Sequence, residues 1–382
     1  MAAFDSLVAG AGIWGCTVAR RLAESGRKVL VLDKRGAVGG NVRCETDAKT
    51  GIEVHVYGSH IFHTHIPEVW DFINRFVRFN GYQHKVLARH AGQTYFLPVG
   101  LALVNKLFGV ELTPGELSSF MSDDAHRQTV FDAFFKNYTA KQWGIPADQV
   151  DPAIIRRVPV RSTYDVNYFN DYNQGIPLTG YNSLFERMLD HPNIQVKTRS
   201  VLQLENGEFF ILDEKNKTSD PLSKSDSGLQ IFYSGPVDAL FGYRFGALPW
   251  RTLRFESERL PVSDAQGTAV VNYVDADVPY TRQHEYKHYH PERADVMSHP
   301  ETIVCREFSA AWREGDEPYY PVDTADSRAL LTRYQSEVEK INLHSRTSTQ
   351  DSNFSLTVGG RLGGYKYYDM DRTVEAALAV EI

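Results

Sequence analysis

Arginine side chains near the middle of the chain are the best candidates for binding a phosphate group. Residues 154–161 read IIRRVPVR, so that three arginines surround a proline in what we expect to be a loop. An arginine fork matches two phosphate oxygens at once and stays charged at any working pH. Arg282, in the segment VPYTR at 278–282, is a second candidate, although a single arginine is more often a surface charge.

Aromatic side chains are concentrated beside these arginines. Nine of them lie between residues 131 and 172, about twice the density of the whole chain, in which 12% of residues are aromatic. Phe134, Phe135 and Tyr138 stand at i, i+1 and i+4 of an expected helix, and stripes of this kind usually belong to a core. The same flat rings would also stack on a nucleobase. An aromatic shelf beside an arginine loop indicates a nucleotide substrate, and core packing stays open as the alternative.

Histidines form two clusters that resemble metal sites. Residues 57–65 read YGSHIFHTH, and residues 284–288 read HEYKH, which matches the zinc motif H-E-x-x-H. The motif binds zinc only on a helix, whereas 284–288 favours a strand, in which ~3.3 Å per residue would hold its two histidines about 13 Å apart. The first cluster has no cysteine or carboxylate cluster beside it. We therefore predict no metal, and we expect His60 and His63 to contact a cofactor or to be structural.

The amino-terminal segment must position these groups, and it reads as strand, glycine turn, helix and strand. Gly10, Gly12 and Gly15 form G-x-G-x-x-G, whose glycines allow a tight turn, a close pyrophosphate and helix packing on the strand. Ile13 lies at the start of the helix, where free N–H groups and the positive dipole end face phosphates. Asp33 ends the second strand, in position to accept hydrogen bonds from ribose hydroxyls. We predict a bound dinucleotide.

A second glycine-rich loop distinguishes between cofactors. Residues 34–41 read KRGAVGGN, and in many flavoproteins such a loop follows the ribose-binding acid and lies against FAD. A nicotinamide dehydrogenase does not need it, so FAD is the predicted cofactor. Binding of an NADP phosphate by Lys34 and Arg35 stays open as an alternative. A third glycine loop at 357–371 precedes the final helix and repeats the phosphate-binding pattern.

Length and composition exclude several classes of protein. With 41 basic and 48 acidic side chains the net charge is −7, the wrong sign for general nucleic-acid binding. No apolar run approaches the ~18 residues of a membrane span, and no signal segment follows Met1. Three scattered cysteines suit a reducing compartment. We expect a cytoplasmic protein without nucleic-acid or membrane partners, and a homo-oligomer.

Eight motifs in a fixed order resemble a known family. They are GxGxxG at 10–15, VGGN at 38–41, GSHIFHT at 58–64, YTAKQW at 138–143, RVPVR at 157–161, VPYTR at 278–282, EPYYP at 317–321 and GGRLGGYKY at 359–367. Together they run over nearly the whole chain and resemble the bacterial UDP-galactopyranose mutases. The resemblance implies an FAD enzyme, active only with reduced flavin, that interconverts UDP-galactopyranose and UDP-galactofuranose.

The resemblance also implies which residues carry each role. The implied cofactor-binding residues are Gly10, Gly12, Ile13, Gly15, Asp33, Lys34, Gly40, Asn41, His60, Arg361, Asp369 and Met370. The implied substrate-binding residues are Asn80, Phe134, Phe135, Tyr138, Thr139, Trp143, Arg157, Tyr168, Asn272, Arg282, Tyr320 and Tyr367, with uracil on the aromatic shelf and the diphosphate on the arginines and tyrosines. The implied catalytic residues are Arg157 on a mobile loop, Arg282 as its fixed counterpart, and His63.

The mechanistic hypothesis is covalent catalysis by the cofactor. N5 of reduced FAD attacks the anomeric carbon, UDP leaves, and the ring contracts by closure through O4. Arg157 and Arg282 stabilise the departing UDP, whose charge grows in the transition state. Two alternatives stay open: an amine-oxidase-like FAD oxidoreductase, which shares the amino-terminal motifs but has no use for a diphosphate clamp, and a nucleotide-binding protein without flavin.

The predicted fold is α/β, with a Rossmann-like FAD-binding domain built from discontinuous segments. That domain comprises residues 1–66, about 195–245 and about 345–382. A helical substrate-binding domain is inserted at about 67–155. The mobile loop and an antiparallel or mixed sheet domain comprise about 156–194 and about 246–344.

Overall fold

The computed structural model describes residues 4–151, 160–222, 228–347 and 354–382. Its amino-terminal unit is a five-stranded parallel sheet with the strand order β19-β13-β1-β2-β9. The strands are β1 (Ser6–Ala9), β2 (Val29–Asp33), β9 (Ile194–Thr198), β13 (Gln230–Tyr233) and β19 (Ser355–Val358). β1, β2 and most of β13 are buried, as expected for strands covered on both faces. A Rossmann-like fold built from discontinuous segments is therefore confirmed.

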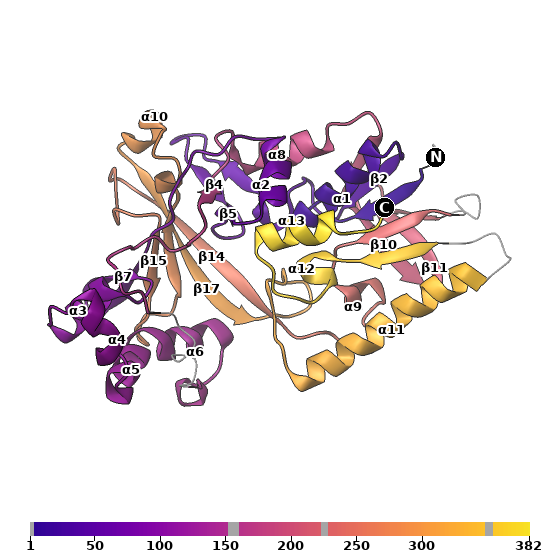
Figure 1. The fold of residues 1–382 in the computed structure, drawn as a ribbon. Helices are drawn as coiled ribbons and strands as arrows, with labels where there is room; N and C mark the ends of the chain where they lie inside the picture. The colour runs from indigo at the N-terminus through magenta and orange to yellow at the C-terminus, as the bar shows by residue number, and fades with distance from the viewer. Residues whose placement is uncertain (1–3, 152–159, 223–227, 348–353) are drawn as a thin grey trace.

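Helices from distant parts of the chain cover this sheet. They include α1 (Ile13–Glu24), α8 (Gly180–Leu189) and α13 (Met370–Leu378). Figure 1 shows α13, in yellow, next to α1, in indigo, and a guanidinium nitrogen of Arg21 donates to the carbonyl oxygen of Ala377 at 2.8 Å. Helix α13, near the carboxyl terminus, therefore packs in the same domain as the amino-terminal helix α1.

A seven-stranded sheet of mixed direction forms the other half of the molecule, with the order β18-β14-β17-β16-β15-β6-β7. Its strands are β6 (Val86–His90), β7 (Gln93–Leu97), β14 (Trp250–Leu260), β15 (Val270–Tyr273), β16 (Arg282–Glu285), β17 (Thr302–Ala311) and β18 (Tyr320–Pro321). All neighbours pair antiparallel except β6 and β15, which are parallel.

The hairpin of β6 and β7 adds two strands to the insert that we expected to be helical for much of its length. Val86 and Ala88 are buried while Leu87 and Arg89 are not, the two-residue period of a strand. The helices of the insert are α2 (Pro67–Asn74), α3 (Leu101–Phe108), α4 (Pro114–Phe120), α5 (Asp124–Val130), a π-helical segment η2 (Phe131–Lys136) and α6 (Asn137–Trp143). Figure 1 shows α3 to α6 gathered at one end of the large sheet. The predicted helical insert is thus correct for most of its length, and the proposed domain boundaries stay predictions.

The remaining helices and strands of the described residues include the long helix α11. They are η1 (Gly40–Val42), β3 (Cys44–Thr46), β4 (Glu53–His55), β5 (Phe62–Thr64), η3 (Ala147–Gln149), β8 (Asn173–Gly175), β10 (Ser200–Glu205), β11 (Glu208–Asp213), β12 (Thr218–Pro221), α9 (Val237–Leu240), η5 (Tyr286–Tyr289), α10 (Ala294–Met297), α11 (Ala325–Thr347) and α12 (Gly360–Gly363). The pairing of β5 with β8 carries the 169–171 segment to the histidine-rich strand. Among the described residues, no helix is both long enough and apolar enough to span a membrane.

Candidate functional site

Two glycine-rich loops form a backbone cradle at the carboxyl ends of β1 and β2. Gly10 has a φ of +109°, in the left-handed region that favours glycine. A side chain at Gly15 would overlap the carbonyl oxygen of Gly10, and one at Gly40 would come within 2.9 Å of the Cα atom of Gly12. The glycines are needed because backbone approaches backbone at these points.

A cavity of about 420 Å³ lies beside this cradle. It is lined by ten of the predicted cofactor-binding residues: Gly10, Gly12, Ile13, Asp33, Lys34, Gly40, Asn41, His60, Arg361 and Met370. Gly15 instead packs the helix against the strand, as the motif requires, and Asp369 lines a second cavity. The predicted set therefore gathers in one place.

Asp33 is buried at the end of β2, and its carboxylate accepts two backbone hydrogen bonds. The N–H groups of Ala11 and Arg35 each donate to it at 2.8 Å. Burial raises the pKa of Asp33, and these two bonds oppose the rise. Asp33 thus fixes the first glycine loop while it lines the cavity.

Lys34 and Arg35 both pair with Glu317, at 3.1 and 2.8 Å. Arg35 also donates to the amide oxygen of Asn41 at 2.7 Å and lies over the ring of Tyr57. One carboxylate thus pairs with both cations, and the alternative of an NADP phosphate at this loop stays open.

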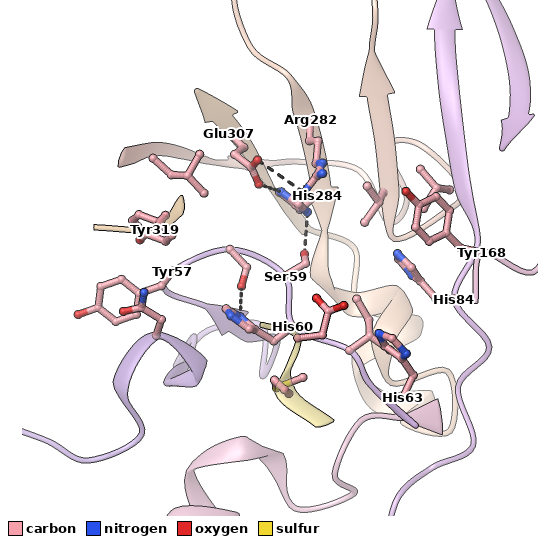
Figure 2. A pocket seen from close by; sticks show the side chains of 18 of the residues that line it. Tyr57, Ser59, His60, His63, His84, Tyr168, Arg282, His284, Glu307 and Tyr319 are labelled. Carbon is pink, nitrogen blue, oxygen red and sulfur yellow. Dashed lines mark hydrogen bonds and ion pairs between the residues drawn. The ribbon is translucent and has the colours of Figure 1, made fainter. Parts of the chain in front are cut away.

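A second cavity, of about 320 Å³, adjoins the first, since Asn41, His60, Arg361 and Met370 line both. Its wall comes from β5, β6, β14, β15, β16, β17 and β18, from the 57–61 and 168–169 segments, and from residues near the carboxyl terminus. Figure 2 shows histidines, tyrosines, an arginine and a glutamate directed into it. A charged reaction chamber thus continues from the glycine cradle.

Arg282, the first residue of β16, connects this chamber to the aromatic helix. Its Nε donates to the hydroxyl of Tyr138 at 2.9 Å, and its guanidinium lies 3.7 Å from a carboxylate oxygen of Glu307 on β17. Burial by itself raises the pKa of Glu307, but the charge of Arg282 and a hydrogen bond from His284 lower it to about 2. Glu307 is therefore an anion that holds a permanently charged arginine at the cavity.

Lys141 anchors the loop that leads to Arg282. Its ammonium group donates to the carbonyl oxygens of Tyr273, Asp275 and Val278 at 2.6, 2.9 and 2.9 Å. Because Lys141 and Tyr138 lie on the same helix, α6, this anchor fixes the distance between Tyr138 and the arginine that it contacts.

Each ring nitrogen of His284 contacts another side chain. Its Nδ1 lies 2.7 Å from the hydroxyl of Ser59, and its Nε2 lies 3.0 Å from Glu307. The H-E-x-x-H segment is a strand that turns into a 3₁₀ helix at Tyr286, not the continuous strand that we expected. His288 contacts Asp264 instead, at 3.3 Å, so the two histidines do not face one site.

Three further histidines line the chamber. The Nδ1 of His60 lies 2.7 Å from the carbonyl oxygen of Gly58, and burial together with the charge of Arg361 lowers its pKa to about 4. Burial also lowers the pKa of His84 to about 3. The Nδ1 of His63 lies 2.7 Å from the carboxylate of Asp171. These rings therefore differ in the partners that hold them.

Polar side chains of the chamber suit a sugar diphosphate. Tyr168, Tyr320 and Tyr367 line it, and the last two rings stack with centroids 5.8 Å apart. The amide oxygen of Asn272 also lines it and, in the described part of the chain, is buried without a hydrogen-bond partner. A buried polar atom of this kind is unfavourable until a ligand or water satisfies it.

Several predicted substrate residues lie outside this chamber. Phe134 is only 4% exposed and packs against Tyr95 in the core of the helical layer, whereas Trp143 is 40% exposed. Phe135, Tyr138 and Thr139 are half-buried. Phe134 thus follows the core alternative in this structure.

Asn80, predicted to bind the substrate, has an amide with all its hydrogen bonds made within the protein. It donates to the carbonyl oxygen of Tyr289 and to Glu292, and it accepts from the N–H groups of Tyr82 and Ile176. It lines neither cavity, so the structure gives it a role in holding the 80–82 turn. Arg157 lies outside the described residues.

Five cavity-wall and supporting side chains were missed from the sequence: Ser59, His84, Asp171, His284 and Glu307. Glu307 and Asp171 carry no motif, and they matter only because strand pairing brings them to a histidine or an arginine. The two histidines could have been proposed from the sequence, since histidine is often functional. His284 was instead interpreted as the first residue of a zinc motif.

Comparisons with known proteins agree with this arrangement. The family model for UDP-galactopyranose mutase matches residues 133–367, and a model for an NAD(P)-binding Rossmann-like domain matches residues 8–76. A crystal structure of reduced UDP-galactopyranose mutase superposes with a TM-score of 0.69 at 14% identity, over 99% of this chain and 96% of that chain. At this identity the superposition shows a shared fold.

Curated relatives match over almost the full chain. A probable UDP-galactopyranose mutase from Klebsiella pneumoniae is 37% identical over 97% of this chain and 92% of its own length. A dTDP-fucopyranose mutase from Escherichia coli is 35% identical, over 97% and 96%. The UDP-galactopyranose mutase of Mycoplasma pneumoniae is 34% identical, over 98% and 95%. With its dinucleotide cradle, its arginine-lined chamber and these matches, the chain belongs to the UDP-galactopyranose mutase family.

Proposed function

We propose that the protein interconverts UDP-galactopyranose and UDP-galactofuranose with reduced FAD as its cofactor. The observation that carries this proposal is the position of Arg282, held by Glu307 and Tyr138 at the wall of a chamber that adjoins the dinucleotide cradle. An oxidase of the amine-oxidase type has no need for such a fixed diphosphate-binding arginine.

The residues of the cradle fit FAD. The close contact that a Cβ at Gly40 would make with Gly12 shows a loop pressed against the phosphate-binding turn, as a flavin site needs. Asp33 lines the cavity at the ribose position of the motif, and Arg361 lies between the two cavities. When bound, reduced flavin would supply N5 as the nucleophile for the anomeric carbon of the sugar.

The chain's own residues would bind, orient and stabilise. Arg282 would neutralise the UDP leaving group as its charge grows, an interaction strongest in the transition state. Tyr320 and Tyr367 would donate to phosphate oxygens. Asn272, with its unsatisfied amide oxygen, would accept from a sugar hydroxyl. Arg157, from the loop predicted to close over the substrate, would add a second positive charge.

A second candidate substrate is dTDP-fucopyranose. The dTDP-fucopyranose mutase from Escherichia coli matches this chain nearly as well as the UDP-galactopyranose mutases do. The two substrates differ at the base, at the ribose 2′-hydroxyl and at C6 of the sugar, while the ring change is the same. The reaction class is therefore common to both candidates.

One experiment tests the reaction and the substrate. Protein reduced with dithionite is incubated separately with UDP-galactofuranose and with dTDP-fucofuranose, and the products are separated by chromatography. We expect UDP-galactopyranose to form with the higher kcat/KM, and only with reduced protein. A higher kcat/KM for the thymidine substrate would reassign the substrate, and turnover of neither nucleotide would refute the proposed reaction.

A further inference from the structure

The proposed ring contraction requires a proton to change oxygen atoms. In the pyranose, O5 is the ring oxygen and O4 carries a proton, whereas in the furanose O4 is the ring oxygen and O5 carries the proton. The reaction therefore needs a group beside the sugar that gives a proton to O5 and takes one from O4. This inference rests on the proposed function.

The chamber contains four histidines, and they are not equivalent. His284 has a hydroxyl on one nitrogen and a carboxylate on the other, at 2.7 and 3.0 Å, so neither nitrogen is available. Within the described part of the chain, the ring nitrogens of His60 and His84 contact uncharged groups, the carbonyl oxygen of Gly58 and the hydroxyl of Tyr82. Burial lowers the pKa of both, so each stays neutral near pH 7.

His63 combines a carboxylate partner with an available nitrogen. Its Nδ1 lies 2.7 Å from Asp171, and among the described residues no hydrogen bond reaches its Nε2. The ring lines the chamber and stacks on Phe169, with centroids 3.6 Å apart and an angle of 14° between the planes. Figure 2 shows the ring at the chamber wall across from His60. Stacking and hydrogen bonding together fix the orientation of this imidazole.

Asp171 determines which nitrogen of His63 carries the proton. A carboxylate only accepts, so Nδ1 must donate to it, and the lone pair of the neutral ring is then on Nε2. The other oxygen of Asp171 lies 3.1 Å from Nδ1 of His65, whose Nε2 lies 3.2 Å from Arg372 on α13. The carboxylate is therefore held from both sides and has little freedom to turn away.

We propose that His63 carries the proton between O5 and O4, and that Asp171 is the positioning residue that presents its Nε2 to the sugar. The cycle begins with the ring of His63 protonated on both nitrogens. As the C1–O5 bond breaks, assisted by a lone pair of the nucleophile that would have replaced UDP at C1, its electrons pass to O5, and O5 takes the proton from Nε2. The ring is then neutral, with Nδ1–H donating to Asp171 and the lone pair on Nε2. When an O4 lone pair forms the C1–O4 bond, Nε2 takes the proton from O4. His63 ends each turnover as it began, and no oxidant or reductant is consumed.

Nitrogen NMR tests the position of the proton without any turnover. Flavin-loaded protein labelled with ¹⁵N-histidine is compared with His63→Gln to assign the ring signals of His63. At a pH where this ring is neutral we expect Nδ1 to be protonated in the wild type, and this preference to be lost in Asp171→Ala. A wild-type ring protonated on Nε2 would overturn the proposal, whatever the substrate of the enzyme is.

Kinetics test the role in the reaction. For Asp171→Ala we expect kcat to fall about 10- to 100-fold with KM changed less than about twofold, and for His63→Gln a fall of about 10²- to 10⁴-fold. The double variant should be no slower than His63→Gln alone, because Asp171 acts through His63. A full additive loss in the double variant, or normal kcat in Asp171→Ala, would refute the positioning role.

Controls separate this role from folding and from the proposed function. Asp295→Ala removes a carboxylate elsewhere in the fold and should keep kcat within about twofold, since the side chain of Asp295 is 69% exposed and lines neither cavity. Bound FAD and affinity for UDP should match the wild type in Asp171→Ala. If that variant loses FAD, the nearly isosteric Asp171→Asn replaces it. Absence of any mutase activity in the wild type would refute the proposed function, while the NMR result would still decide the arrangement of Asp171 and His63.

Discussion

The two adjoining cavities differ in the groups that form their walls. The first, the backbone cavity, is built around the closely approaching backbone of Gly10, Gly12 and Gly40, with further lining from the 200–202, 233–243 and 312–318 regions and the end of the chain. The second, the side-chain cavity, is lined by side chains from seven strands and several separate segments, with charged groups that hold one another in place. The comparison teaches that the shape of the first cavity depends on local steric requirements of a few glycines. The charged groups of the second cavity come together only when strands far apart in the sequence pair in the correct register.

The largest effect is expected from closing the backbone cavity. Gly40→Val places a branched side chain 2.9 Å or less from the Cα atom of Gly12, at a position whose φ is +56°. We expect loss of bound flavin and of all activity, measured by the flavin absorbance of the purified protein. Gly115→Ala is the matched control, since a Cβ there meets nothing within 4 Å and we expect no change. Normal flavin content in Gly40→Val would show that this loop does not touch the cofactor.

Removing the charge of the side-chain cavity should leave the other cavity intact. For Arg282→Ala we expect kcat/KM to fall by about 10²- to 10³-fold or more, because the leaving diphosphate loses a fixed cation. Flavin content should equal that of the wild type. Arg328→Ala, at an exposed position of α11, serves as the control and should behave as the wild type. Loss of flavin in Arg282→Ala would mean that the two cavities are not independent.

The pair of buried Glu307 and half-buried Arg282 predicts a pH dependence of stability. Because the pKa of Glu307 is lowered to about 2, its contribution is fully present above the unfolded pKa and is lost as the pH falls toward about 2. Wild type should therefore have a higher Tm than Glu307→Gln at pH 7, and the difference should shrink below about pH 4.3. Thermal unfolding of both proteins between pH 7 and pH 3 measures this. A constant difference would show that Glu307 is not charged in the folded protein.

The smallest expected effect concerns the aromatic residues at 131–143, and it distinguishes a role in core packing from a role in stacking on the nucleobase. Phe134 is buried, so Phe134→Leu should cost roughly 1 kcal/mol of stability and leave UDP affinity within about twofold. Phe135→Leu, at the half-buried neighbour, is the matched variant. Denaturant unfolding and UDP titration measure the two quantities. A clear loss of UDP affinity in Phe134→Leu, without loss of stability, would restore this ring to the nucleotide shelf.

Much of the fold was predictable from particular residues. The glycine motif with Asp33, and the buried strands on either side of it, required a strand-turn-helix-strand unit. The hairpin at Val86 to Leu97 was missed because the helical period of the preceding segment was extended over a two-residue alternation. A strand at His284 was predicted and is confirmed, but the contacts of His284 with Ser59 and Glu307 depend on strand pairing that its neighbours in sequence do not encode.

The sequence by itself determined the position of the dinucleotide-binding loop. A backbone with positive φ, or one approached closely by another backbone, requires glycine, and such glycines can be recognised in the sequence. Its ordered motifs also determined the family. Only the tertiary structure decided which charges neutralise one another, which histidine has a free nitrogen and which aromatic rings are core. Those properties depend on burial and on contacts between residues more than a hundred positions apart, such as Arg282 with Tyr138 and His63 with Asp171.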